Sequence, residues 1–263
     1  MKQLMMIGFG AMGQTVLAHL PPGLALAWVV VPERSIDKVR AQVGAGVQVI
    51  HSVAACAERP DLVIEVAGQA GVREHAAAVL ARGWDMALIS VGALADAELA
   101  QRLEVAAVAG GGTLTVLAGA VAGMDGLAAA KEGGLEQVVY HGCKSPNSWR
   151  GSHAESLIDL DQVTAKTVFF EGSAREAATL FPANANVAAT IALAGLGMDQ
   201  TQVVLTVDPD SQKNQHRIEA AGAFGQMSIE LAGVPLPSNP KTSTLAALSV
   251  VRACRLCLSG IKV

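Results

Sequence analysis

A glycine motif near the amino terminus constrains the fold of this chain more than any other feature. The run Gly8-Phe9-Gly10-Ala11-Met12-Gly13 fits Gly-x-Gly-x-x-Gly and directly follows an apolar, strand-like run, Lys2 to Ile7. In a strand–turn–helix unit the first glycine permits a tight turn, the second leaves room for a pyrophosphate, and the third lets the helix pack closely on the strand. Helix N–H groups and the helix dipole then face the anion. The motif predicts a dinucleotide site at Gly8, Gly10, Ala11, Met12 and Gly13.

The end of the second expected strand bears on which dinucleotide is bound. Glu33 and Arg34 stand there, about twenty residues past the glycine motif. A carboxylate at this place accepts a hydrogen bond from the ribose 2′-hydroxyl of NAD, whereas a guanidinium pairs with the 2′-phosphate of NADP. We therefore expect use of both NAD and NADP. The alternative is that Glu33 and Arg34 form a solvated surface turn that binds no ligand.

The first half of the chain alternates strand-like and helix-like segments, which is typical of a parallel sheet covered on both faces. The expected strands are Lys2–Ile7, Leu26–Val31, Val47–Ile50, Asp61–Val66, Met86–Val91 and Thr113–Leu117. The expected helices are Met12–Leu20, Ile36–Val43, Val72–Arg82 and Asp96–Ala109. With right-handed crossovers, this order predicts an α/β fold with a doubly wound parallel Rossmann sheet.

The rhythm changes after Gly119, where longer and more polar strands are mixed with helices. The expected strands are Leu135–Lys144, Gln202–Asp208 and His216–Leu231, the last with hairpin glycines Gly222 and Gly225, and the expected helices are Arg175–Leu180, Asn184–Leu196 and Thr242–Leu258. This pattern predicts a Rossmann domain over 1–118, onto which the terminal helix 241–263 packs back, and an α+β (mixed-sheet) domain for substrate binding and dimerisation over 119–240. The segment 147–161 has the least pattern and is typical of a mobile or site-covering loop.

Composition and charge exclude several classes of function. The 263 residues carry a net charge of −4 with scattered Lys and Arg, so the basic surface that nucleic acids require is missing. Residues 105–124 are uncharged, but the glycines at 110–112 interrupt any helix there, so we expect no membrane span. No signal pattern opens the chain, which favours the cytoplasm. The four cysteines are expected to be buried, and their spacing provides no metal site.

Several strings make the chain similar to the L-aspartate dehydrogenase family. They are 90–94 (SVGAL), 118–125 (AGAVAGMD), 181–190 (FPANANVAAT) and 239–243 (NPKTS), together with the glycine motif and His216. The resemblance implies a Rossmann domain, a mixed α/β domain, a homodimer, and NAD(P)-dependent oxidative deamination of L-aspartate. It also implies that Ala120 and Asn186 contact the nicotinamide nucleotide and that His216 is the active-site residue. Pro32 before Glu33 departs from the common family pattern, which leaves the cofactor preference open.

The residues themselves bear on this chemistry. Oxidation of an amino acid needs a neutral amine, so a base must take the ammonium proton, and histidine titrates in the right range. His216 leads into small residues where a ligand could approach, although a lone histidine on a strand is more often structural. Asn186 could cap a helix, but Asn184 is better placed for that role. For the two substrate carboxylates the candidates are Lys241, Thr242 and Lys144, followed by Arg150.

Two other interpretations remain open from the sequence. A reductase similar to dihydrodipicolinate reductase or homoserine dehydrogenase would share the architecture, and substrate-dependent NAD(P)H formation would distinguish it. A non-catalytic NAD(P)-sensing regulator would need no base, so replacement of His216 would leave its behaviour unchanged.

Overall fold

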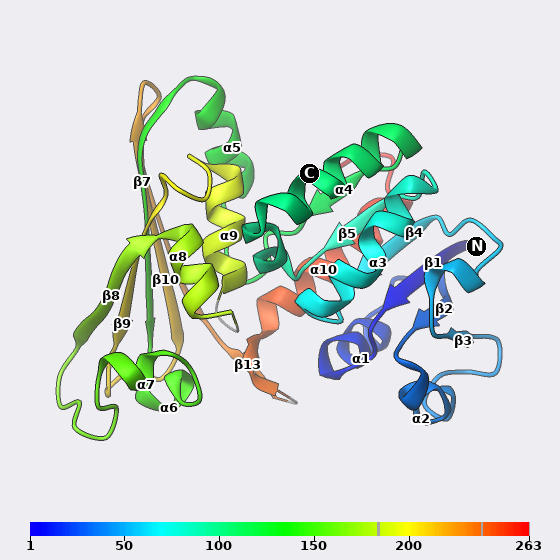
Figure 1. The fold of residues 1–263 in the computed structure, drawn as a ribbon, viewed down its shortest axis with the longest axis horizontal. Helices are drawn as coiled ribbons and strands as arrows, with labels where there is room; N and C mark the ends of the chain where they lie inside the picture. The colour runs from blue at the N-terminus through cyan, green and yellow to red at the C-terminus, as the bar shows by residue number, and fades with distance from the viewer. Residues whose placement is uncertain (183–184, 238, 263) are drawn as a thin grey trace. The chain divides into compact units, whose positions relative to one another are not determined.

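The chain divides into two compact units in a computed structural model (Figure 1). The first unit comprises Met1–Leu117 and Ala247–Val263, and the second comprises Ala118–Ala246. The structure describes residues 1–182, 185–237 and 239–262, apart from the side chains of Ala185, Pro240 and Lys241.

A parallel sheet of six strands forms the centre of the first unit. The strands are β1 (Lys2–Ile7), β2 (Leu24–Val30), β3 (Gln48–Ile50), β4 (Leu62–Glu65), β5 (Met86–Leu88) and β6 (Leu114–Val116). Their order is β3-β2-β1-β4-β5-β6, and every pair is parallel. The predicted doubly wound Rossmann sheet is thus confirmed. The strand order reverses between β1 and β4, and ligands of such sheets bind outside the carboxyl ends of the strands at this switch point.

Helices connect these strands as the apolar periodicity predicts. They are α1 (Ala11–Ala18), α2 (Ile36–Arg40), α3 (Gln69–Ala81) and α4 (Ala97–Gly110), with short 3₁₀ turns η1 (Glu33–Ser35), η2 (Val53–Ala55) and η3 (Val91–Ala95). The Asp96 side chain caps α4 by accepting from the Leu99 N–H (3.1 Å), and Gly111 ends it in the left-handed conformation. Since Gly111 and β6 interrupt the uncharged stretch 105–124, the chain cannot continue there as one helix. None of the described helices is long and apolar enough to cross a bilayer.

The last helix, α10 (Thr244–Leu258), has its carboxyl-terminal part in the first unit. There the Lys2 ammonium donates to the Cys257 carbonyl (2.7 Å). Cys56, Cys143 and Cys254 are buried, whereas Cys257 is half-buried at the end of the helix, so its expected burial was wrong. The expected helix start at Thr242 was wrong as well. Thr242 and Ser243 belong to a strand, because β13 (Asn239–Ser243) pairs with β12 (Pro235–Leu236).

A mixed sheet of five strands forms the second unit, which confirms the predicted α+β class. Its order is β11-β10-β7-β9-β8, from β7 (Leu135–Lys144), β8 (Thr167–Ser173), β9 (Gln202–Val207), β10 (Asn214–Gly222) and β11 (Gly225–Gly233). The helices are α5 (Met124–Glu132), α6 (Pro146–Trp149), α7 (Ala154–Leu157), α8 (Ala174–Leu180) and α9 (Ala185–Ala194). Only the β7–β9 pair is parallel.

The sequence pattern missed β8 and α5 and placed the start of β10 too late. Strand β10 begins at Asn214, so the polar residues before His216 already belong to the sheet. The hairpin glycines were placed correctly, since Gly222 pairs with Gly225 across the β10–β11 turn. Gly225 has φ +111°, a conformation that favours glycine.

Candidate functional site

The absence of a side chain has a different structural consequence at each of the three motif glycines. Gly8 has φ +91°, and a Cβ there would lie 2.6 Å from the Ala67 Cα. A Cβ on Gly13 would lie 3.0 Å from the Met6 sulfur, so this glycine allows α1 to pack on β1. A Cβ on Gly10 would meet no atom within 4 Å among the described residues, its two chain neighbours aside. The fold itself therefore does not require a glycine at position 10. Its missing side chain leaves open space at the N-terminus of the helix that starts with Ala11 and Met12.

A buried carboxylate that the sequence analysis missed supports the neighbouring loop. Glu65, at the end of β4, accepts hydrogen bonds from the N–H groups of Ala67 (2.7 Å), Gly68 (2.8 Å) and Ser90 (3.0 Å) and from the Ser90 hydroxyl (2.9 Å). Burial raises the pKa of Glu65, while the Ser90 hydrogen bonds oppose that rise. The sequence did offer a signal for this residue, because Glu65 is an acidic residue at the end of an apolar strand and precedes Gly68 by three residues.

The Glu65 carboxylate thus ties the end of β5 to the loop after β4. That loop touches the glycine turn, because Ala67 is the neighbour that Gly8 accommodates and the Val66 N–H donates to the Ile7 carbonyl (2.8 Å). These contacts lie at the switch point between β1 and β4, which is the position of the nucleotide in Rossmann sheets.

Glu33 and Arg34 lie in the turn η1 directly after β2, as the dinucleotide prediction requires. Both side chains are exposed, and neither has a hydrogen-bond or ion-pair partner among the residues that the structure describes. They are therefore free to meet a ribose or a 2′-phosphate, and the exposure alone is equally compatible with a solvated turn.

His216 lies in β10, between β11 and β7, and is 4% exposed. It stands opposite Gly142 of β7 and Leu231 of β11. Its Nδ1 lies 2.8 Å from the Tyr140 hydroxyl, and the two rings are nearly parallel at 20°. The Tyr140 contact occupies Nδ1, so Nε2 is the ring nitrogen left for a reactant.

Gly142 makes the contact between Tyr140 and His216 possible. Residues directly opposite in an antiparallel pair point to the same face, and so do residues two apart in a strand, so Tyr140, Gly142 and His216 share one face. A Cβ on Gly142 would lie 2.7 Å from the Tyr140 hydroxyl oxygen. The absent side chain therefore lets the buried phenol reach across the strand pair.

Lys144 adds a positive charge on the same face of β7. Its side chain is half-buried, with Nζ 5.1 Å from the centre of the Trp149 ring, and burial lowers its pKa to about 8. Burial, followed by the charge of Lys144, lowers the pKa of His216 to about 4. Near neutral pH the site thus combines a neutral imidazole with a nearby ammonium, which suits an anionic reactant that must lose a proton.

The remaining predicted residues lie in other segments of the chain. Ala120 is half-buried in a turn after β6, and Asn186 is half-buried in the first turn of α9. Thr242 accepts from the Asn239 amide (3.0 Å) in β13. Asn184 and the side chain of Lys241 lie outside the described residues. Of the predicted site residues, the structure brings Lys144 and His216 together, while the glycine motif belongs to the other unit.

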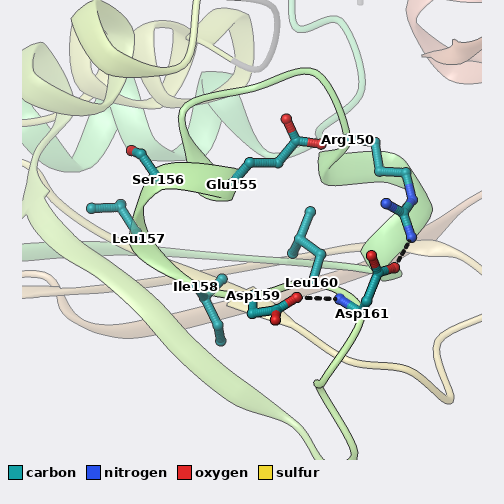
Figure 2. Close-up of a pocket in the computed structure, with 8 residues that line it drawn as sticks. All are labelled: Arg150, Glu155, Ser156, Leu157, Ile158, Asp159, Leu160 and Asp161. Carbon is teal, nitrogen blue, oxygen red and sulfur yellow. Dashed lines mark hydrogen bonds and ion pairs between the residues drawn. The ribbon is translucent and has the colours of Figure 1, made fainter.

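The segment 147–161 forms two short helices and a hollow of about 410 Å³ (Figure 2). Its charged groups pair locally, since Arg150 forms an ion pair with Asp161 and the Asp159 carboxylate accepts from the Asp161 N–H (3.0 Å). The fully buried Trp149 anchors the segment, and its indole N–H donates to the Thr206 carbonyl (3.1 Å). Arg150 is therefore a surface ion-pair residue in this structure.

Two family models together match most of the chain. Residues 125–256 match the family model of the aspartate dehydrogenase C-terminal domain, and residues 8–117 match that of the NAD-binding domain of homoserine dehydrogenase. An L-aspartate dehydrogenase of Acinetobacter baylyi is 65% identical over 263 residues, which is 100% of both chains.

Two solved structures are similar in fold to this chain. The crystal structure of aspartate dehydrogenase from Thermotoga maritima has a TM-score of 0.79 at 25% identity and covers 100% of this chain and 99% of that one. Dihydrodipicolinate reductase from Paenisporosarcina sp. has a TM-score of 0.54 at 12% identity, with 98% and 94% covered, a likeness of fold alone. On the full-length identity and the matching family model, the chain belongs to the aspartate dehydrogenase family.

Proposed function

We propose that the protein catalyses the reversible NAD(P)-dependent oxidative deamination of L-aspartate to iminosuccinate, which hydrolyses to oxaloacetate and ammonia. The observation that carries this proposal is the 65% identity, over the full length of both chains, to a protein named L-aspartate dehydrogenase. Homodimerisation and a cytoplasmic location complete the proposal, and sedimentation of the purified protein would test the first.

His216 is the proposed acid–base group. An ammonium has no lone pair to form the imine, so it must lose a proton before hydride departure, and the water that attacks the imine must lose one later. For Nε2 to accept a proton, Nδ1 must carry the ring hydrogen, which the Tyr140 oxygen at 2.8 Å can accept. The low pKa of His216 keeps the ring neutral, and therefore able to act as a base, at neutral pH.

Lys144 is the proposed partner of a substrate carboxylate. Lys144 is two residues after Gly142 and so shares the face of the sheet that carries His216. A charge-assisted hydrogen bond to a carboxylate is strong where water is scarce. Thr242 and Lys241 remain proposed contacts for the same dicarboxylate.

The nicotinamide cofactor supplies the hydride acceptor when bound. Gly8, Gly10 and Gly13, with Ala11 and Met12 at the head of α1, would hold its pyrophosphate against backbone N–H groups. Glu33 and Arg34 would meet the ribose or the 2′-phosphate, which supports use of both NAD and NADP. Asn186 would orient the nicotinamide through its amide, and the small Ala120 would leave room for the ring.

A spectrophotometric scan of amino acids with NAD⁺ and with NADP⁺ tests the proposal. We expect NAD(P)H formation with L-aspartate, ammonia in equal amount, and the reverse reaction from oxaloacetate and ammonia. Turnover only with a dihydrodipicolinate or homoserine substrate would indicate the sister reductases. Cofactor binding without turnover of any substrate would indicate a regulator.

A further inference from the structure

The hydroxyl of Ser243 is buried and has no hydrogen-bond partner among the residues that the structure describes. The residue is only 8% exposed. Ser243 ends β13 and directly precedes α10, a place where a serine side chain usually caps the helix by accepting from an N–H of its first turn. No such bond forms here. Buried polar groups rarely stay unsatisfied, so this hydroxyl calls for a partner outside the chain.

The position of Ser243 connects it to the His216 site. A Cβ built on Gly233 would lie 3.5 Å from the Ser243 hydroxyl oxygen, so the hydroxyl lies over the side-chain face of Gly233. Gly233 pairs with Asn214, and Asn214 and His216 point to the same face of β10. The hydroxyl therefore lies over the face that carries His216, and His216 is two residues, or roughly 7 Å, from Asn214 along the strand.

The helix that follows adds an electrostatic preference. Helix α10 has 15 residues and no acidic residue in its first turn. Its amino-terminal end carries a partial positive charge, which favours an anion there. A hydroxyl donor without a partner among the described residues and a helix N-terminus together provide the two features that a carboxylate requires.

We propose that Ser243 and the N-terminus of α10 bind one carboxylate of a dicarboxylate substrate, with the Ser243 hydroxyl donating the hydrogen bond. This inference rests on the proposed function, since it assigns the second carboxylate of aspartate while Lys144 binds the other. It makes Ser243 a substrate-binding residue and explains why its hydroxyl is left without a partner among the described residues.

The test is Ser243→Ala, with Thr201→Val as the matched control. Thr201 also has a buried hydroxyl without a partner in the described chain, but it precedes β9, whose first residue Gln202 pairs with Val139, away from His216. For Ser243→Ala we expect KM for L-aspartate and Kd for succinate to rise about 10- to 150-fold, since a hydrogen bond to a charged group is lost. NAD⁺ affinity and the melting temperature should not fall, and Thr201→Val should keep both substrate constants.

Succinate binding by calorimetry in the presence of NAD⁺ separates this inference from the proposed function, because it needs no turnover. If the wild type oxidises aspartate but Ser243→Ala keeps its KM and its succinate Kd, the hydroxyl holds only water and the inference is wrong. A melting temperature lowered by Ser243→Ala, with unchanged succinate binding, would likewise assign the hydroxyl to the fold. If the wild type does not oxidise aspartate, the proposed function fails, and the succinate Kd values still decide the role of Ser243.

Discussion

Replacement of Gly10 by alanine should separate cofactor binding from folding. The backbone at Gly10 (φ −82°, ψ −162°) suits alanine, and the added Cβ would meet no atom of the described residues within 4 Å, chain neighbours aside. Such a substitution removes freedom from the unfolded chain and should raise the free energy of unfolding by about 0.4–1 kcal/mol. The methyl group would instead occupy space that a bound pyrophosphate needs.

The expected loss of affinity follows from this overlap. Inserting a methyl group into packed space costs about 1–3 kcal/mol, which corresponds to a rise in the dissociation constant of roughly 5- to 150-fold. Calorimetric titration of NAD⁺ and NADP⁺ measures the constant, and denaturant unfolding without nucleotide measures the stability.

Two other glycines of the same unit are the controls. Gly44→Ala also adds a Cβ without a neighbour within 4 Å among the described residues, so it should raise stability to a similar extent while leaving nucleotide affinity unchanged. Gly8→Ala should destabilise the fold itself, because its Cβ would lie 2.6 Å from the Ala67 Cα at φ +91°. Unchanged nucleotide affinity in a folded Gly10→Ala protein would show that the pyrophosphate does not lie on this turn.

Four further predictions concern single side chains. His216→Ala should slow aspartate oxidation and oxaloacetate amination by about 10²–10⁴-fold, or roughly 3–5 kcal/mol, with nearly unchanged NAD(P) affinity. His141→Ala, on the opposite face of the same strand pair, should keep the rate, and a His216 variant that keeps more than about a tenth of it would mean that the base lies elsewhere. Arg34→Ala should lower kcat/KM with NADP⁺ more than with NAD⁺, and equal losses would exclude Arg34 as the discriminator. His216 has a pKa of about 4 in the folded protein and about 6.5 in the unfolded chain. Its contribution to the free energy of unfolding, about 3 kcal/mol, is therefore present above pH ~6.5 and is lost as pH falls through ~4. Unfolding titrations from pH ~4 to ~7 should therefore be flatter for His216→Ala, and parallel curves would contradict the shift. Glu65→Gln should destabilise the fold by about 1–3 kcal/mol and weaken NAD⁺ binding, since an amide cannot accept from all four donors. Thermal unfolding with and without NAD⁺ measures both effects. An unchanged melting temperature in both conditions would show that the carboxylate supports neither the fold nor the nucleotide site.

The sequence by itself determined the first unit. Its evidence is local, because the glycine motif, the apolar strands and the intervening helices each lie within a short stretch of chain. Strand ends were displaced by a few residues, as at β2 and β5, since strand length depends on pairing with neighbours. The steric reasons for Gly8 and Gly13 were also predictable, because they follow from backbone geometry within one turn.

Only the tertiary structure brought the groups of the second unit together. Tyr140 and His216 are 76 residues apart, and their contact depends on the register that sets Gly142 opposite His216. A register shift of one residue would turn every side chain of a strand to the other face, and no local pattern specifies that register. The family resemblance gave His216 as a candidate residue but gave no sign of Tyr140. Glu65 was missed for the same reason, since its four donors come from two loops that the sheet brings together. Burial that arises from such packing is also the main cause of its shifted pKa.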